Sequence, residues 1–301
     1  MLFQVEMSNK TTVPSMTLEP TSDPDLFRLC DRKGDWTHYF HQPTKRYLPA
    51  VNHILHTAYN KGERFMQYLL SVSKDEAKDK LERAGNRGTR VHQAINEMIL
   101  GKEIRLDTTF LNELTGRHES LTDDEWKMLR SFTRWVEDFK PETVIFDTAV
   151  CSLKSGFAGT LDWYGTVSIS VKTAPQKVEQ VRVYCLIDWK SSSAVWDEYA
   201  YQLGGYDTAL IEKGVIGSDT CCTAILRLGT KHKSGYEFKL YSPEESAMNR
   251  IGWMQVRSMF VLMTGGEEFN PVIEEIPTTL QVKIPQVVVK PKKRKYTKHV
   301  K

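Results

Sequence analysis

One apolar segment of this chain contains an acid and a base two positions apart. The stretch VRVYCLIDWKSSS, residues 181–193, has the composition of a buried strand. Side chains alternate between the two faces of a strand, so Asp188 and Lys190 share one face and Trp189 lies on the other. Neither charge is cheap to bury without a partner or a metal ion. The segment therefore predicts either a structural ion pair or a chemical site on a sheet.

The order of the segments around this strand predicts a single α/β domain, with a helical N-terminal part, a sheet, one crossing helix, more sheet and a final helix. Two capping boxes mark helix starts, Thr122 with Glu125 and Ser242 with Glu245. Strands are predicted over residues 143–153, 156–167, 180–190, 221–229 and 236–241. Helices are predicted over residues 48–59, 61–73, 73–85, 86–102, 121–141, 195–214 and 243–264.

The two ends of the chain differ in composition from its middle. Residues 1–45 are rich in Pro, Ser, Thr and charges without periodicity, which predicts an irregular arm before a domain spanning residues 46–266. Residues 267–301 predict an extended basic tail. Its last twelve residues contain seven Lys and Arg, and subtracting these from the net charge of +3 leaves −4 for the remainder. The tail fits nucleic-acid contact, a nuclear localisation signal (PKKRK) or a solvated end.

The composition is that of an ordinary globular protein, with 40% hydrophobic and 26% charged residues. There is no apolar run of membrane-spanning length and no signal-peptide pattern at the N-terminus, so we expect a soluble intracellular protein without a membrane partner. Five scattered cysteines show neither metal spacing nor a disulfide framework, which favours reduced thiols.

Four sequence features carry candidate chemistry. His92 lies at the edge of the apolar stripe of the helix predicted over residues 86–102, and Asp162 lies on a strand that follows a glycine-containing approach. Asp188 belongs to the segment described above. Gln202 and Tyr206 are four residues apart and therefore share one helix face.

Two carboxylates and a lysine on neighbouring strands can support phosphodiester hydrolysis. Asp162 and Asp188 are oxygen donors suited to Mg²⁺ or Mn²⁺, and the Trp189 carbonyl and a His92 nitrogen could complete the coordination. Lys190 would hold the nucleophile and offset charge on the phosphate.

Each feature also has a structural interpretation of its own. His92 alone would more often be a boundary histidine, and Asp188 with Lys190 could be an ion pair on a strand face. Asp162 could lie in a turn, and Gln202 with Tyr206 could be ordinary packing on a helix that covers the sheet. The four features together favour a functional site, because chance would have to place all of them in order on fitting elements.

His92, GTLD (residues 159–162), IDWK (187–190) and QLGGY (202–206) resemble, in that order, the RecB-like branch of the PD-(D/E)xK nuclease superfamily. The RGTRVH lead-in to His92 resembles the histidine motif of that family, and the match spans about residues 48–230. The resemblance implies a restriction-endonuclease-like core with a central mixed β-sheet flanked by helices. It also implies that His92, Asp162 and Asp188 are metal ligands and that Lys190 is the catalytic lysine.

By the same resemblance, Gln202 and Tyr206 would organise the site or contact DNA. Asp147 occupies a position where many relatives carry glutamate, with a shorter reach. Some relatives hold an iron–sulfur cluster, but Cys221 and Cys222 lack the required spacing, so no cluster is expected.

The leading hypothesis is a Mg²⁺- or Mn²⁺-dependent DNase, an exonuclease of bacterial or phage replication, recombination or repair. A catalytically silent DNA-binding scaffold and a structure-specific endonuclease are the alternatives. The expected partners are DNA ends or single strands, with a helicase or a single-strand-binding or recombination protein. The expected compartment is the cytoplasm of a bacterial or phage-infected cell, or the nucleus only if the tail is a localisation signal.

Overall fold

The computed structural model describes residues 12–31, 34, 36–59, 74–174, 177–217, 221–266 and 269–277. They belong to two units, the main one spanning Thr17–Asn270 and a small one comprising the chain up to Met16 and from Pro271 onward. In the small unit, β1 (Thr12–Pro14) pairs antiparallel with β13 (Glu275–Pro277). Part of the predicted extended tail is thus a short strand, and residues 278–301, with all seven basic residues of its end, lie outside the described residues.

A five-stranded mixed sheet forms the centre of the main unit, in the order β12-β11-β10-β9-β8. Only β10 and β11 run parallel, and the other neighbours are antiparallel. All five strands lie where the sequence predicts them, and the mixed α/β class is confirmed. Their bounds are β8 (Glu142–Ser152), β9 (Phe157–Ala174), β10 (Lys177–Lys190), β11 (Cys222–Leu228) and β12 (Tyr236–Tyr241).

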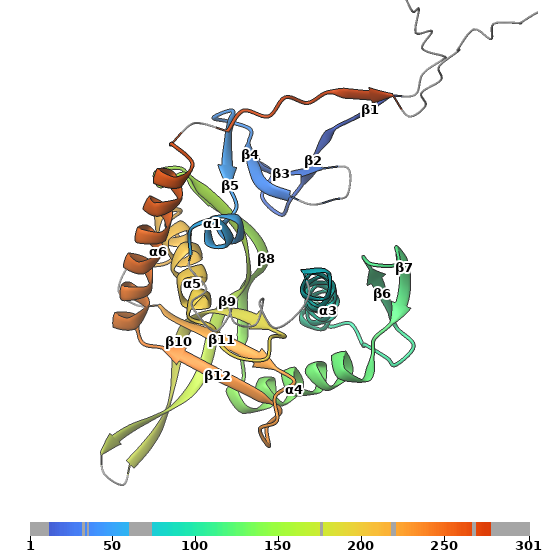
Figure 1. Ribbon diagram of the computed structural model, residues 1–301. Coiled ribbons are helices and arrows are strands. Elements are labelled where there is room, and N and C mark those ends of the chain that lie inside the picture. Colours follow the sequence, from blue (N-terminus) through green and yellow to red (C-terminus); the bar gives the residue numbers. More distant parts are fainter. Residues whose placement is uncertain are drawn as a thin grey trace, which may run out of the picture. The chain divides into compact units, whose positions relative to one another are not determined.

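Helices cover both faces of this sheet, and the alternation along β10 assigns each face its core (Figure 1). Leu186 belongs to the core that packs against α1 (Val51–Ala58), α5 (Asp197–Glu212) and α6 (Pro243–Met263). Ile187 and Trp189 belong to the opposite core, against α3 (Lys74–Ile99) and α4 (Asp123–Phe139). The predicted buried strand is therefore apolar on both faces because both faces are covered.

The predicted helix signals are confirmed at α4 and α6. The Thr122 hydroxyl accepts the Glu125 N–H while the Glu125 carboxylate accepts the Thr122 N–H, and Ser242 with Glu245 does the same. Each box satisfies two donors that a helix start leaves unpaired. α4 ends at Phe139, with Lys140 in the left-handed region, before Pro141. None of the described helices is long and apolar enough to cross a membrane.

α3 is one continuous helix, whereas the sequence predicts two helices that meet at residues 85 and 86. Gly85 and Gly88 do not interrupt it, because buried contacts of Val91, Ala94 and Ile95 with the sheet and α4 outweigh the low helix propensity of glycine. The helix predicted over residues 61–73 lies outside the described residues.

The prediction of an irregular arm up to residue 45 is wrong for the described residues, and the helical N-terminal part is not confirmed. A four-stranded sheet lies there instead, in the order β2-β3-β4-β5, and the first described helix begins at Val51. These strands are only four to six residues long and are separated by polar turns, so the alternation of apolar and polar residues is too short to be recognised in the sequence. Their bounds are β2 (Met16–Pro20), β3 (Leu26–Asp31), β4 (Trp36–His41) and β5 (Arg46–Pro49).

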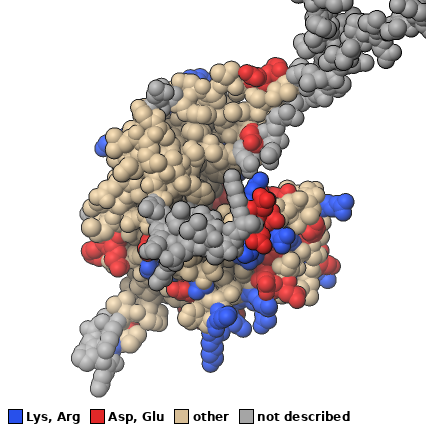
Figure 2. Space-filling view, in the orientation of Figure 1, with Lys and Arg blue, Asp and Glu red and all other residues tan. Residues whose placement is uncertain are grey.

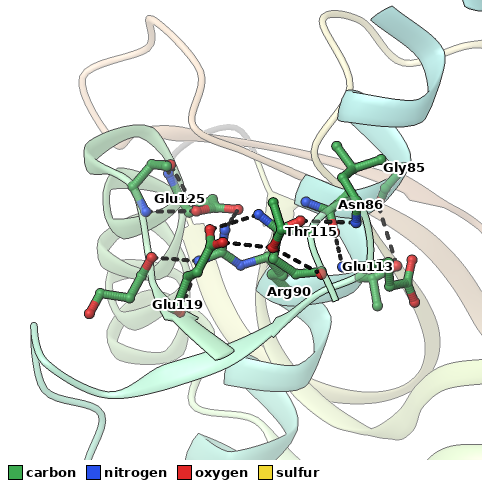
Figure 3. A network of polar contacts seen from close by, with 12 residues as sticks. Gly85, Asn86, Arg90, Glu113, Thr115, Glu119 and Glu125 are labelled. Atoms are coloured by element: carbon green, nitrogen blue, oxygen red, sulfur yellow. Dashed lines mark hydrogen bonds and ion pairs between the residues drawn. The ribbon is translucent and has the colours of Figure 1, made fainter. Parts of the chain in front are cut away.

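A buried ion pair ties α3 to α4 and to the hairpin of β6 (Thr109–Asn112) and β7 (Arg117–Ser120), as Figure 3 shows. Arg90 and Glu125 lie 3.5 Å apart, and both side chains are only 3% exposed. The Arg90 guanidinium also donates to the carbonyl oxygens of Glu119 and Ser120, at 3.2 and 2.6 Å. This arrangement fixes the rotation of α3 about its own axis.

Two helical glycines provide a matched test of the packing between α5 and α6. A Cβ at Gly204 would lie 2.4 Å from the backbone oxygen of Asn249, whereas a Cβ at Gly85 would meet nothing within 4 Å. Alanine favours a helix by about 1 kcal/mol at either site. We expect Gly85→Ala to raise the free energy of unfolding by up to about that amount, and Gly204→Ala to lower it by about 1–3 kcal/mol through overpacking. Urea unfolding followed by circular dichroism measures both, and equal effects would contradict the close approach of α5 and α6.

Candidate active site

Strands β9 and β10 cease to pair at the point where the predicted site begins. Their antiparallel ladder ends with Trp163 opposite Ile187, while β10 continues to pair with β11 as far as Lys190. The Trp189 N–H donates instead to the Asp162 carboxylate, at 2.7 Å. A side chain thus replaces a ladder partner here, and the end of the ladder leaves room for polar groups between the strands.

All seven residues that the sequence singled out line one cavity of about 630 Å³. They come from α3, β9, β10 and α5, elements that are far apart along the chain. The structure thus brings the four motifs to one place, as the sequence analysis expected of a joint site. The seven residues are His92, Asp162, Asp188, Trp189, Lys190, Gln202 and Tyr206.

His92 joins α3 to both strands through its two ring nitrogens. Its Nε2 lies 3.1 Å from the Trp189 carbonyl oxygen, which can only accept, so Nε2 carries the proton. Its Nδ1 lies 3.2 Å from an Asp162 carboxylate oxygen. Burial alone would lower the pKa of His92, but the charge and the hydrogen bond of Asp162 together with the charge of Asp188 outweigh it, and the pKa lies above the usual value.

Lys190 is held by three partners at the other side of the cavity. Its ammonium lies 2.6 Å from Asp188 Oδ2, donates to Gln202 Oε1 at 2.8 Å and stands 4.5 Å above the Tyr199 ring. The Gln202 amide donates in turn to the Tyr206 hydroxyl, at 3.0 Å. The spacing of four residues on α5 therefore builds a polar chain that points the lysine into the cavity.

The two carboxyl groups have opposite pKa shifts. Burial raises the pKa of Asp188 to about 6, with the Asp162 charge adding to it and Lys190 opposing it. Burial acts on Asp162 in the same direction, but His92, Lys190 and the Trp189 N–H outweigh it and lower the pKa. Asp162 is thus ionised at neutral pH, whereas the pKa of Asp188 lies close to neutral pH. Pairs of carboxyl groups with opposite pKa shifts occur in many active sites.

The oxygen atoms of Asp162, Asp188 and Trp189 are of the chemical type that binds a hard divalent cation. Asp188 Oδ2 is buried and, among the described residues, has no partner other than the Lys190 ammonium. Carboxylate and carbonyl oxygens beside it, from Asp162 and Trp189, are the ligands that Mg²⁺ and Mn²⁺ prefer. Within the described part of the chain, no three His, Cys, Asp or Glu side chains are already gathered around a common point. His92 and Asp162 are instead paired with each other.

Gly159, the first residue of the GTLD motif, lies directly beneath Tyr206. A Cβ at this position would lie 2.6 Å from the Tyr206 ring, closer than such atoms approach in proteins. The glycine therefore makes room for the tyrosine. Gly88 is not required in this way, because a Cβ there would lie 3.5 Å from the Ser191 hydroxyl, an ordinary van der Waals contact.

Sequence reasoning missed the side of the cavity that the N-terminal strands form. Arg28 on β3 stacks over Trp36 on β4 at 5.0 Å and donates to the Thr160 hydroxyl at 3.3 Å, and all three line the cavity. No signal could have found Arg28 and Trp36, since their segment lacks visible periodicity. Tyr199 also lines the cavity. It lies one helical turn before Gln202, so the helix periodicity could have placed it on the same face.

Asp147, which the resemblance places where many relatives carry glutamate, also lines the cavity. Its backbone has a positive φ of 43°, and the ladder of β8 with β9 keeps its register from Phe146 to Thr148 without a pairing at Asp147 itself. Burial raises its pKa, Arg28 opposes this, and the Asp162 charge adds to it. A third carboxyl group thus lines the cavity beside Asp162 and Asp188.

A scan against protein-family models finds no matching family, and a search of curated proteins finds no match. The functional interpretation therefore depends on the motifs and on the geometry of the cavity.

Removing the ammonium beside Asp188 tests the electrostatics of the site without any assumption about activity. In Lys190→Ala the carboxyl group loses the charge that opposes its burial, so its pKa should rise above about 6. Lys190→Arg should keep it near the wild-type value, because the guanidinium retains the charge. Carbon-13 NMR titration of the Asp188 carboxyl group measures the shift, and an unchanged pKa in Lys190→Ala would rule out the pairing.

Proposed function

We propose that this chain is a Mg²⁺- or Mn²⁺-dependent deoxyribonuclease that hydrolyses phosphodiester bonds, acting as an exonuclease. The observation that carries the proposal is the meeting of Asp162, Asp188 and Lys190 in one cavity, at the point where β9 and β10 cease to pair. Two carboxylates and a cation on adjacent strands are the protein groups that metal-assisted phosphodiester hydrolysis requires.

The arrangement of the domain supports a restriction-endonuclease-like core of the PD-(D/E)xK type. A mixed sheet with helices on both faces presents the GxxD and DxK motifs on neighbouring strands β9 and β10. The helix with His92 and the helix with Gln202 and Tyr206 approach from opposite cores. The order of the four motifs along the chain and their convergence in space agree with this interpretation.

In this proposal Asp162, Asp188, the Trp189 carbonyl and His92 would hold the metal ion. A bound divalent cation polarises a phosphoryl oxygen and lowers the pKa of water. Both nitrogens of His92 are engaged in the structure, Nε2–H with the Trp189 carbonyl and Nδ1 with Asp162, so His92 would have to release Asp162 from Nδ1 to become a ligand. Its nitrogen favours Mn²⁺ over Mg²⁺ as a ligand.

Lys190 supplies positive charge at the position of the phosphate. Burial would lower the pKa of its ammonium, but Asp188 and Asp162 raise it, so the side chain is a cation at neutral pH. The Gln202 carbonyl accepts one of its protons and is itself positioned by Tyr206. Of the three donors of the ammonium, Asp188 and Gln202 engage two, and the third is left to hold the attacking water while the positive charge offsets that of the phosphate.

Bacterial or phage replication, recombination or repair is the setting that we propose, in the cytoplasm. The predicted strand-unwinding partner is a helicase, and a single-strand-binding or recombination protein would present the ends. A nuclear setting would apply only if the basic tail is a localisation signal.

Substitutions of four residues, the proposed metal ligands Asp162, Asp188 and His92 and the lysine Lys190, test the chemistry. Asp162→Ala and Asp188→Ala should abolish cleavage while DNA binding survives, and His92→Ala should be milder and shift the preference between Mg²⁺ and Mn²⁺. Lys190→Ala should lower the cleavage rate by on the order of 10²–10³-fold, as loss of one charge-stabilising donor does. Lys190→Arg should rescue only in part, because a planar guanidinium places its donors differently.

The measurement is the cleavage rate per folded molecule at saturating metal, with Lys154→Ala as a control because Lys154 is exposed and does not line the cavity. Linear and covalently closed DNA, single- and double-stranded, are the substrates. Degradation of linear DNA alone supports the exonuclease, and nicking of closed circles selects an endonuclease. Binding without cleavage by the wild type selects the silent scaffold and overturns the proposal.

A further inference from the structure

Two further hollows continue from the catalytic cavity along the surface. The first, of about 610 Å³, shares Arg87, Ser191 and Ser192 with the cavity. The second, of about 200 Å³, shares Lys127 and the residues 229, 230 and 232 with the first. Together they form one groove that runs from the catalytic lysine over α4 to the turn between β11 and β12.

This groove carries a strong excess of positive charge. Six basic residues line it against one acid, Asp124, which is paired with Lys127 at 2.9 Å, and Arg227 is paired with Glu237, outside the lining, at 2.6 Å, so four of the six are left without an acidic partner in the part of the chain that the structure describes. Figure 2 shows Lys and Arg side chains gathered at the lower edge of the molecule, over α4 and this turn. Among the described residues, Arg130 and Lys231 have no acidic partner. The six are Arg87, Lys127, Arg130, Arg134, Arg227 and Lys231.

The two walls of the groove are held together by direct contacts. Lys127, Arg130 and Arg134 follow one another at the spacing of a single face of α4. The Arg134 guanidinium donates to the carbonyl oxygens of Lys233 and Ser234, each at 3.3 Å, which holds the turn against the helix. A Cβ at Gly229 would lie 2.8 Å from the Met128 side chain, so the backbone of the turn lies close to α4.

The groove is also joined to the segment that follows Lys190. Arg87 donates to the Ser191 carbonyl and Arg227 to the Ser193 carbonyl, each at 3.0 Å. These two arginines, from α3 and β11, hold the serine segment from opposite sides. The beginning of the groove is thus fixed relative to the catalytic ammonium.

We propose that this basic groove, defined by Arg87, Lys127, Arg130, Arg134, Arg227 and Lys231, binds the sugar–phosphate backbone of one nucleic-acid strand that leads away from the catalytic cavity. The inference rests on the proposed nuclease function and adds the path and form of its substrate. The two hollows have no Phe, Tyr or Trp in their lining, so they offer phosphate contacts without base stacking. The cavity of about 630 Å³ and the hollows of about 610 and 200 Å³ follow one another in a single line, which is a path for one strand.

The test is the salt dependence of binding to a fluorescently labelled oligothymidylate, measured by anisotropy with the full chain in the absence of divalent metal. Arg130→Gln/Lys231→Gln removes two exposed charges, and each phosphate contact contributes roughly 0.7 to the slope of log K against log salt for single strands. We expect weaker binding and a slope smaller by about 1.4. Lys154→Gln/Lys239→Gln removes two exposed charges outside the groove and should leave the slope unchanged.

If the groove variant has the same slope as the wild type, the inference is overturned. It is also overturned if the slope of the control variant decreases by as much as that of the groove variant. Tighter binding of duplex than of single strands, with the same loss, would overturn the single-strand assignment. With an RNA oligonucleotide the groove variant should show the same decrease in slope, because the contact is to phosphate. If the wild type cleaves no DNA but the slope falls only in the groove variant, the nuclease proposal fails and the groove stands as a strand-binding site.

Discussion

The parallel pairing of β10 with β11 determines how the rest of the domain is arranged. Two adjacent parallel strands cannot be joined by a tight turn, so the chain must cross one face of the sheet between them. That crossing is α5, and it lies on the face to which Asp188 and Lys190 point. Gln202 and Tyr206 reach the lysine because of this topology. α6 then covers α5, and Gly204 permits the contact between their backbones.

The orientation of α3 depends on a different kind of interaction. Replacing a buried ion pair by well-packed apolar residues is often neutral for stability, so Arg90 and Glu125 are better understood as fixing an orientation. Arg90 lies two residues before His92, and its carbonyl contacts allow α3 only one rotation. With that rotation fixed, the His92 ring faces Asp162 and the Trp189 carbonyl. A buried charge pair on one side of the helix thus orients His92, a residue of the candidate site, on the other side.

Sequence alone predicted the central sheet and the capped helices because these elements carry long periodic signals or paired caps. The site was predictable as well, since Asp162, Asp188 and Lys190 lie on strands with clear apolar patterns. The N-terminal sheet was not, because its short strands mix polar residues with isolated buried ones such as Leu26 and Tyr39. Arg28 and Trp36 lie in that sheet, so their place in the cavity could not be predicted either. Arg90 gave no signal either, because one arginine in a charged helix does not reveal its burial.

The close contact between Gly159 and Tyr206 joins two motifs that are separate in the sequence. The glycine has no side chain where the tyrosine ring needs the space, so the two positions form one steric unit. A larger residue at position 159 would be tolerated only together with a smaller one at position 206. Among relatives of this chain the two positions are therefore expected to vary together, and a change at one alone would mark a protein whose cavity has been rebuilt.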